Sequence, residues 1–298
     1  MAKFAVITAL RDERDNIDRL FDAMSAQSLV PDTWLIIDDG SQDGSAALLQ
    51  EHAQHYKKGE LIIETLEPSG ASYALGTQYA RLIELGMKRL QGRKDYLDYL
   101  AVGINDADCF PRPDYFTSLI RFLQNRPSLG ITSGLDRRLD GRPGSARLTW
   151  VRGNCRLWRR ECLDETGYLV GPSADTTSLC KARLLGWDAL VEPNALFDAR
   201  EAGALIETEY YGRSAHYRGI SPGYALFKGF FDLMRGHSKM GWGYLRGYLS
   251  AWRAKAPQIT DQQILNYYRW YPLHLLRELP RERKLRAELR ERSNRPPL

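Results

Sequence analysis

The sequence predicts an α/β fold with a mostly parallel sheet flanked by helices. Two observations predict it. Short apolar runs alternate with longer segments whose apolar residues recur at helical spacing, and clusters of Asp, Gly and Ser follow several of the apolar runs. The chain of 298 residues is long enough for one large domain or two small ones.

Four apolar runs in the first third of the chain predict strands. They occupy residues 4–8, 34–37, 61–64 and 99–104. The segments between them predict helices, and turn residues bound these segments. The helices are expected at residues 13–27, 45–55 and 69–91, the last with Tyr79 in its apolar pattern. Because parallel strands point the same way, the loops that follow them gather at one edge of the sheet.

Two aspartates end the fourth predicted strand. Asp106 and Asp108 are one residue apart, and Pro111 and Pro113 then prevent the strand from continuing. Alternate residues of an extended chain point the same way, so both carboxylates can face one spot. Carboxylate oxygens suit Mg²⁺ or Mn²⁺, which in turn can carry nucleotide phosphates. The alternative is a turn with two solvated acids.

The other loops at the same sheet edge fit a nucleotide. They comprise residues 8–13, 38–41 and 69–73, which supply acidic acceptors and glycines that let a ligand approach the backbone. Neither Gly-x-Gly-x-x-Gly nor Gly-x-x-x-x-Gly-Lys-Ser/Thr is present. This argues against a dinucleotide-binding dehydrogenase and against a P-loop enzyme.

The composition is that of a soluble globular protein, with 43% hydrophobic and 27% charged residues. The apolar runs are shorter than the roughly 18 residues that a membrane helix needs. The first run, residues 4–10, meets four charged residues at once, so we interpret it as a strand and not as a signal peptide. The four cysteines are scattered, which predicts reduced thiols in a cytoplasmic protein.

Positive charge gathers near the end of the sequence. Residues 253–298 hold 11 Lys or Arg and 5 Asp or Glu, whereas the whole chain has a net charge of +5. Aromatic and basic residues alternate over residues 219–252. This region is expected to be helical and either to pack on the rest of the protein or to meet an anionic membrane surface, peripherally on the inner face of the cell membrane. No nucleic-acid-binding module is recognisable, so no nucleic-acid partner is expected.

Three stretches together resemble the inverting family 2 glycosyltransferases of the GT-A fold. They are residues 7–17, with Arg-Asp-Glu and Asn-Ile; residues 36–44, with Asp-Asp-Gly-Ser-Gln-Asp-Gly; and residues 106–116, with Asp-x-Asp and a downstream Pro-Asp. The resemblance covers residues 4 to 125 well and the following segment more loosely. It implies a GT-A catalytic domain at residues 1–205, with a nucleotide-binding half (1–125) and an acceptor half (126–205). Residues 206–298 would form a helical extension.

The resemblance also implies roles for individual residues. Asp106 and Asp108 would hold Mn²⁺ or Mg²⁺. The nucleotide-sugar would contact Thr8, Ala9, Leu10, Arg11, Glu13, Asp39, Gly70, Ser72 and Asp106. Arg11 and Glu13 would pair with each other, or Glu13 would contact the donor. Two departures stand out: Ala174 replaces the usual Glu, and Leu75-Gly76 replace an Arg-Asn pair.

Asp175 matches the position of the family's catalytic base. A carboxylate there would accept the proton of the attacking acceptor hydroxyl. The alternative is that Asp175 only caps a helix at residues 176–185.

The implied activity is metal-dependent, inverting transfer of a sugar from a nucleotide-sugar donor. The acceptor would be a saccharide or lipid-linked molecule in cell-surface polysaccharide or lipopolysaccharide synthesis. One alternative is a sugar-nucleotide nucleotidyltransferase, which would need a Gly-rich basic loop after the first strand that the sequence lacks. The other is a non-catalytic carbohydrate- or nucleotide-binding relic of the fold.

Overall fold

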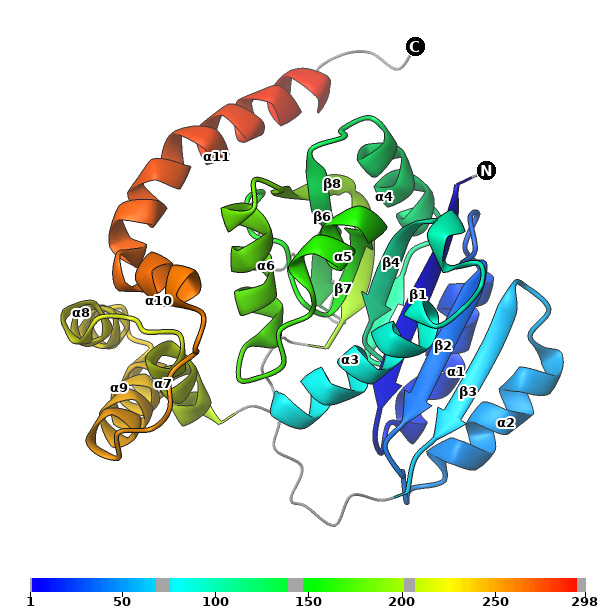
Figure 1. The fold of residues 1–298 in the computed structure, drawn as a ribbon, viewed down its shortest axis with the longest axis horizontal. Helices are drawn as coiled ribbons and strands as arrows, with labels where there is room; N and C mark the ends of the chain where they lie inside the picture. Colours follow the sequence, from blue (N-terminus) through cyan, green and yellow to red (C-terminus); the bar gives the residue numbers. More distant parts are fainter. Residues whose placement is uncertain (1, 68–75, 139–146, 201–206, 294–298) are drawn as a thin grey trace. The chain divides into compact units, whose positions relative to one another are not determined.

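The computed structural model describes residues 2–67, 76–138, 147–200 and 207–293 (Figure 1). The chain divides into two compact units, Met1–Ala202 and Gly203–Leu298. Each unit is described by itself.

The first unit is built on one eight-stranded sheet with the order β3-β2-β1-β4-β7-β6-β8-β5. The strands are β1 (Lys3–Leu10), β2 (Thr33–Asp38), β3 (Glu60–Thr65), β4 (Tyr99–Asn105), β5 (Cys109–Pro111), β6 (Leu129–Arg138), β7 (Cys155–Arg159) and β8 (Asp188–Ala199). The strands β3, β2, β1 and β4 pair in parallel, and so do β6 and β8. Both pairings of β7, and that of β5 with β8, are antiparallel. The α/β fold with a largely parallel sheet is therefore confirmed.

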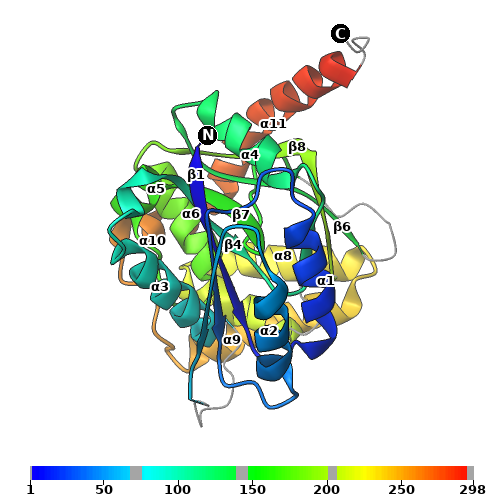
Figure 2. The ribbon, with the colours of Figure 1, turned by 90° about the vertical axis from the view of Figure 1, so that its right-hand side faces the viewer.

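Helices cover both faces of the parallel part of the sheet, as Figure 2 shows. The helices of this unit are α1 (Arg14–Ser25), α2 (Ser45–His55), α3 (Thr77–Gln91), α4 (Tyr115–Gln124), α5 (Arg160–Thr166) and α6 (Ala174–Leu184), with a 3-10 turn η1 at Tyr96–Asp98. On one face the ring of Phe21 in α1 packs 4.8 Å from that of Trp34 in β2. On the other face α3 comes so close that a Cβ atom at Gly86 would lie 2.7 Å from Ile7. Because helices cover both faces, β1 and β2 are buried almost throughout, and their apolar residues do not alternate with polar ones.

The predicted elements of the first half are present, and most of their boundaries differ by one or two residues; the helix expected at residues 13–27, for example, is α1 at Arg14–Ser25. The helix expected at residues 45–55 has those limits, and the four predicted strands are β1 to β4. The helix expected from residue 69 is described only from Thr77, after Gly76 at φ 101°, a left-handed conformation that a helix does not continue through. Gly70 and Ser72 lie outside the described residues.

The second unit consists of helices. They are α7 (Thr208–Tyr217), α8 (Pro222–Met234), α9 (Ser238–Arg253), α10 (Gln262–Arg269) and α11 (Tyr271–Ser293). Glycines let three of them approach closely: a Cβ atom at Gly212 of α7 would lie 2.5 Å from the Tyr248 backbone nitrogen in α9, and one at Gly241 of α9 would lie 2.8 Å from the Gly229 carbonyl oxygen in α8. Within the described part of the chain, no helix combines the length and apolar character that crossing a membrane requires. The four cysteines belong to the first unit and are buried, and none of them forms a disulfide bond, which agrees with the reduced thiols that their spacing predicts.

Candidate active site

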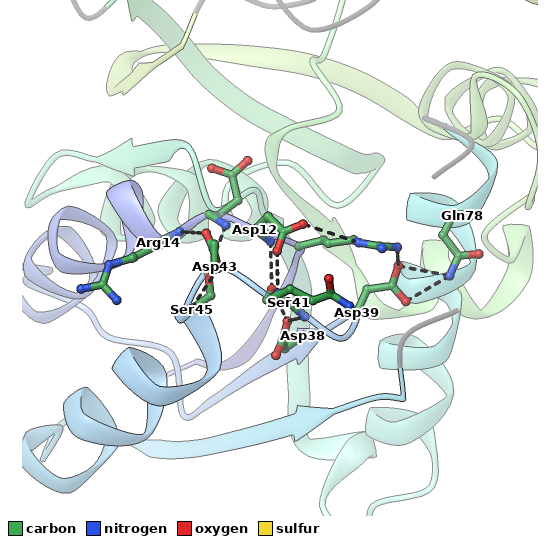
Figure 3. Close-up of polar contacts among 11 residues, drawn as sticks. Asp12, Arg14, Asp38, Asp39, Ser41, Asp43, Ser45 and Gln78 are labelled. Atoms are coloured by element: carbon green, nitrogen blue, oxygen red, sulfur yellow. Dashed lines mark hydrogen bonds and ion pairs between the residues drawn. The ribbon is translucent and has the colours of Figure 1, made fainter. Parts of the chain in front are cut away.

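The loops after β1 and β2 are joined by hydrogen bonds (Figure 3). The Asp12 backbone nitrogen donates to Ser41 Oγ at 2.8 Å, and the Gln42 backbone nitrogen donates to Asp12 Oδ1 at 2.7 Å. Asp43 accepts from the Arg14 backbone nitrogen at 3.0 Å. These bonds hold the two loops side by side at the carboxyl edge of the sheet.

The two aspartates at the end of β2, Asp38 and Asp39, have different surroundings. Asp38 Oδ1 accepts from the Ser41 backbone nitrogen at 3.0 Å and from Ser41 Oγ at 2.5 Å, so this carboxylate shapes the turn. Asp39 accepts instead from Gln78 Nε2, at 3.2 Å to one oxygen and 3.4 Å to the other. The Arg11 guanidinium lies 3.7 Å from Asp39 Oδ2. Asp39 is thus a buried carboxylate held between a cation and an amide.

Polar groups of the residues at the end of β1 form hydrogen bonds within the protein. Trp34 Nε1 donates to Thr8 Oγ1 at 3.0 Å, and the Asp39 backbone nitrogen donates to the Leu10 carbonyl oxygen at 2.9 Å. Thr8, Ala9 and Leu10 are all buried. They support the loop that carries Arg11 and Asp39.

Glu13 has a different partner from the one expected. Its carboxylate accepts from Asn16 and from Arg200 Nη2, the latter at 3.1 Å. Arg11 reaches Asp12 and Asp39 instead, at 3.8 Å and 3.7 Å. The expected pairing of Arg11 with Glu13 is therefore wrong: the Arg200 guanidinium, just beyond β8, occupies the position beside Glu13.

Asp106 and Asp108 follow β4, at the same edge. The Asp106 backbone nitrogen donates to the Asn154 carbonyl oxygen at 2.7 Å, and the Tyr79 hydroxyl donates to Asp106 Oδ1. Desolvation raises the pKa of Asp106 well above its ordinary value, and the nearby negative charge of Asp108 raises this pKa further. Arg200 Nε lies 3.7 Å from Asp108 Oδ2.

Asp175 belongs to the same group of charges. Its negative charge is a further cause of the raised pKa of Asp106. Asp175 stands in the first turn of α6, whereas the N-cap of that helix is Ser173, so the prediction of Asp175 as a helix cap is wrong. Its side chain packs against Gly153, where an added Cβ atom would lie 2.8 Å from Asp175 Oδ2.

Arg156 of β7 places a cation among these acids. Its side chain is buried, and its Nη1 donates to the Asp175 carbonyl oxygen at 3.3 Å. The Arg156 charge lowers the pKa of Asp106, against the effect of the neighbouring carboxylates. Within the described residues, Nε and Nη2 of Arg156 have no hydrogen-bond partner in the protein. Arg156 therefore contributes a buried positive charge beside the acids of the site.

The acidic pair fits a divalent cation. Among the described residues, no three or more His, Cys, Asp or Glu side chains form a metal cluster, so the candidate ligands are the Asp106 and Asp108 carboxylates. Two carboxylates suffice where substrate phosphates and water complete the coordination, as in many Mg²⁺ sites. The pKa of Asp106 is raised first by desolvation and then by the charge of Asp108, and a bound cation would favour the ionised form of both carboxylates.

Several residues of this site were not predicted as functional. They are Gln78, Tyr79, Arg156 and Arg200. Tyr79 was assigned to the apolar pattern of its helix, whereas its hydroxyl contacts Asp106. Each has its partner far away in sequence, so no local motif marks it.

Comparisons with known proteins agree with this architecture. Residues 5–185 match the model of a family described as glycosyl transferase family 2. No curated protein sequence matches the chain. Among solved structures, the fold is similar to the mannosyltransferase PcManGT from Pyrobaculum calidifontis in complex with GDP-Man and Mn²⁺, with a TM-score of 0.56 and 16% identity over 92% of this chain and 80% of that one.

The fold is also similar to TarS from S. aureus, with a TM-score of 0.54 and 14% identity. The match covers 74% of this chain but only 40% of the TarS chain. A TarS structure of residues 1–349 in complex with UDP-GlcNAc matches with a TM-score of 0.54 and 14% identity, over 87% of this chain and 93% of that one. Since the family match spans more than half of the sequence, the chain belongs to glycosyl transferase family 2, has the GT-A fold and is a glycosyltransferase.

Proposed function

We propose that this glycosyltransferase moves a sugar, with inversion at the anomeric carbon, from a nucleotide-sugar donor to a saccharide or lipid-linked acceptor. The reaction would serve cell-surface polysaccharide synthesis at the cytoplasmic face of the membrane. One observation carries the proposal: Asp106, Asp108 and Asp175 form one group of interacting charges at the sheet edge where Asp39 also lies. A nucleotide, its phosphates and a reacting hydroxyl need acceptors of this kind close together.

The nucleotide end of the donor is assigned to Asp39. A buried carboxylate at the end of β2 can accept hydrogen bonds from a base or a ribose, and Arg11 and Gln78 keep it in place. The similar structures carry GDP-Man in one case and UDP-GlcNAc in another, which supports a sugar nucleotide as the donor class.

The diphosphate is assigned to the other end of the site. Asp106 and Asp108 would hold Mn²⁺ or Mg²⁺, which when bound supplies positive charge to the departing nucleoside diphosphate. Tyr79 orients the Asp106 carboxylate through its hydrogen bond. The buried Arg156 cation offsets part of the negative charge around Asp106.

Asp175 is assigned as the general base. In an inverting transfer the acceptor hydroxyl attacks the anomeric carbon opposite the leaving diphosphate, and a carboxylate takes the hydroxyl proton. Asp175 lies in the first turn of α6, packs against Gly153 and is partly exposed. These facts support an acidic group that an acceptor can reach.

The test is release of nucleoside diphosphate from a donor panel in the presence of Mn²⁺ and candidate acceptors. Asp175→Asn should lower acceptor-dependent turnover by about a hundredfold or more, while donor binding persists. Glu161→Gln, at an exposed carboxylate of α5, is the matched control and should keep full activity. Equal turnover in Asp175→Asn and the parent protein would remove Asp175 from the mechanism; no turnover with any donor would favour the non-catalytic alternative.

A further inference from the structure

Exposed apolar side chains are unevenly distributed between the two units. Among the described residues, only three exposed large hydrophobic side chains, Leu97, Leu184 and Leu185, belong to the first unit. Twelve belong to the second unit, and eight of these lie on α8 and α9. An apolar surface of this kind usually marks an interaction site.

The exposed side chains of α8 form one stripe. They are Leu226, Phe227, Phe230, Phe231 and Met234. Their spacing of one, three, one and three residues places all five on one side of a helix. Three of them are strongly exposed: Phe227 at 61%, Phe230 at 54% and Met234 at 79%.

Packing inside the second unit fixes the direction of this stripe. Ala225 and Gly229, on the opposite side of α8, are buried. A Cβ atom at Gly229 would clash with Leu245 of α9, so α8 and α9 are in close contact along that side. The apolar stripe therefore cannot turn toward α9 without losing this contact.

The charge of the hairpin formed by α8 and α9 is strongly positive. Residues 221–256 contain six basic residues and one acidic residue: Lys228, Arg235, Lys239, Arg246, Arg253 and Lys255, against Asp232. The single acid is paired with Lys228 at 2.7 Å. Arg235 lies against the stripe, with its guanidinium carbon 5.4 Å from the centre of the Phe231 ring. Two exposed tryptophans, Trp242 and Trp252, add side chains that favour the boundary between water and lipid.

The last helix, α11, does not have such a strong excess of basic over acidic residues. Residues 277–292 contain seven basic and four acidic residues, and Arg286 pairs with Glu282 at 2.9 Å. A mixed, partly paired surface attracts anionic lipid less than an acid-poor one. The hairpin is therefore a better candidate for a membrane contact than the C-terminal end that the net charge of residues 253–298 indicated.

We propose that the α8–α9 hairpin is a monolayer-inserting surface that docks this glycosyltransferase on an anionic phospholipid bilayer. The stripe of α8 enters the boundary between headgroups and acyl chains, and the basic residues of the hairpin, with Arg235 beside the stripe, attract the anionic headgroups. This deepens the proposed function, on which it rests for its biological setting, because a lipid-linked acceptor is found at such a surface.

The test is cosedimentation of the full chain with vesicles of phosphatidylcholine alone and with added phosphatidylglycerol. The parent protein should bind the anionic vesicles. The double variant Phe227→Ser with Phe230→Ser should lose about tenfold or more in partition coefficient. Lys239→Ala with Arg253→Ala should lose roughly fivefold per residue, on the anionic vesicles only. Met234→Ser provides a third, independent probe of the stripe should the Phe double variant fail to fold.

Two control variants separate this surface from others. Leu97→Ser removes an exposed apolar side chain of the first unit, and Arg283→Ala with Lys284→Ala removes charge from α11; both should bind vesicles as the parent does. Vesicle binding that persists in the stripe variants, or that is lost in the α11 variant alone, would overturn the proposal. So would a parent protein that ignores anionic vesicles and forms a dimer that the stripe variants dissociate.

The assay is independent of the chemistry. It contains no donor, so failure to bind vesicles says nothing against sugar transfer. Nucleotide binding, measured separately by thermal shift, should be equal in the parent and the stripe variants. If the Phe double variant lost both nucleotide binding and vesicle binding, it would have a folding defect. The vesicle binding of Met234→Ser would then decide whether the stripe contacts the membrane.

Discussion

Gly153 and Asp175 touch across two elements. Gly153 precedes β7 and Asp175 stands in the first turn of α6, and an added Cβ atom at Gly153 would lie 2.8 Å from both the Cβ and the Oδ2 of Asp175. Asp175, the proposed base, can therefore hold its present position only because residue 153 is a glycine.

Gly153→Ala should push the Asp175 side chain away and lower turnover by about tenfold to a hundredfold, because a catalytic group displaced by about 1 Å loses much of its effect. Steady-state kinetics with circular dichroism would measure this. Gly223→Ala, where an added Cβ atom meets nothing within 4 Å, is the control. Unchanged turnover in Gly153→Ala would contradict the claim that catalysis depends on the present position of the Asp175 side chain.

Asp106 is held at a cost to stability. Its pKa is raised by desolvation and by the charges of Asp108 and Asp175, so the unfolded chain releases this proton at a lower pH than the folded protein does. As the pH rises from the ordinary pKa of an aspartate to the raised pKa of Asp106 in the folded protein, ionisation of Asp106 increasingly destabilises the folded state. Below the ordinary pKa, Asp106 is protonated in both states and has no such effect.

Asp106→Asn should accordingly raise the melting temperature in metal-free buffer, by more at pH 8 than at pH 5, while it lowers turnover. Differential scanning calorimetry with EDTA across this pH range would test the sign. Glu161→Gln, which removes an exposed carboxylate, should show no such pH trend. A variant less stable than the parent at pH 8 would contradict the electrostatic account.

At the scale of elements, α3 connects two parts of the site. Consecutive residues of its first turn reach different acids: Gln78 donates to Asp39 after β2, and Tyr79 donates to Asp106 after β4. The start of this helix thus sets the position of both the nucleotide end and the phosphate end of the proposed donor site.

Gln78→Ala should weaken nucleotide binding about fivefold, the effect of losing a hydrogen bond of about 1 kcal/mol that holds Asp39 in place. Titration calorimetry with the preferred nucleotide would give the value. Arg81→Ala, an exposed position on the same helix, should bind as the parent does. If Gln78→Ala bound equally well, Arg11 alone would be sufficient to orient Asp39.

At the scale of the molecule, the sequence predicts the parallel half of the sheet well. Strands β1, β2 and β4 are largely buried, and the edge strand β3 is partly exposed. Each of the four has an apolar run that stands out from its surroundings, and recognisable motifs follow β1, β2 and β4. The family resemblance of residues 7–17, 36–44 and 106–116 lies in that same region, and the family match extends from residue 5 to residue 185.

The other half depends on contacts between distant segments. The antiparallel strand β7 lies between β4 and β6, and the three-residue β5 pairs with β8 at the far edge. A run of three residues has no periodicity to detect. Arg200 likewise reaches Glu13 across 187 positions, and this contact replaces the ion pair expected from neighbouring residues.

The measurement that tests the central claim most directly is a thermal shift of the full chain with UDP-, GDP-, dTDP- and CMP-sugars, each with and without Mn²⁺. At a hundredfold excess over the dissociation constant, a ligand of the folded state should raise the melting temperature by roughly 5 °C. The account predicts a rise with one nucleotide class that needs Mn²⁺ and is lost in both Asp39→Ala and Asp108→Ala. No rise with any nucleotide in folded protein, or a rise that both variants retain, would contradict it.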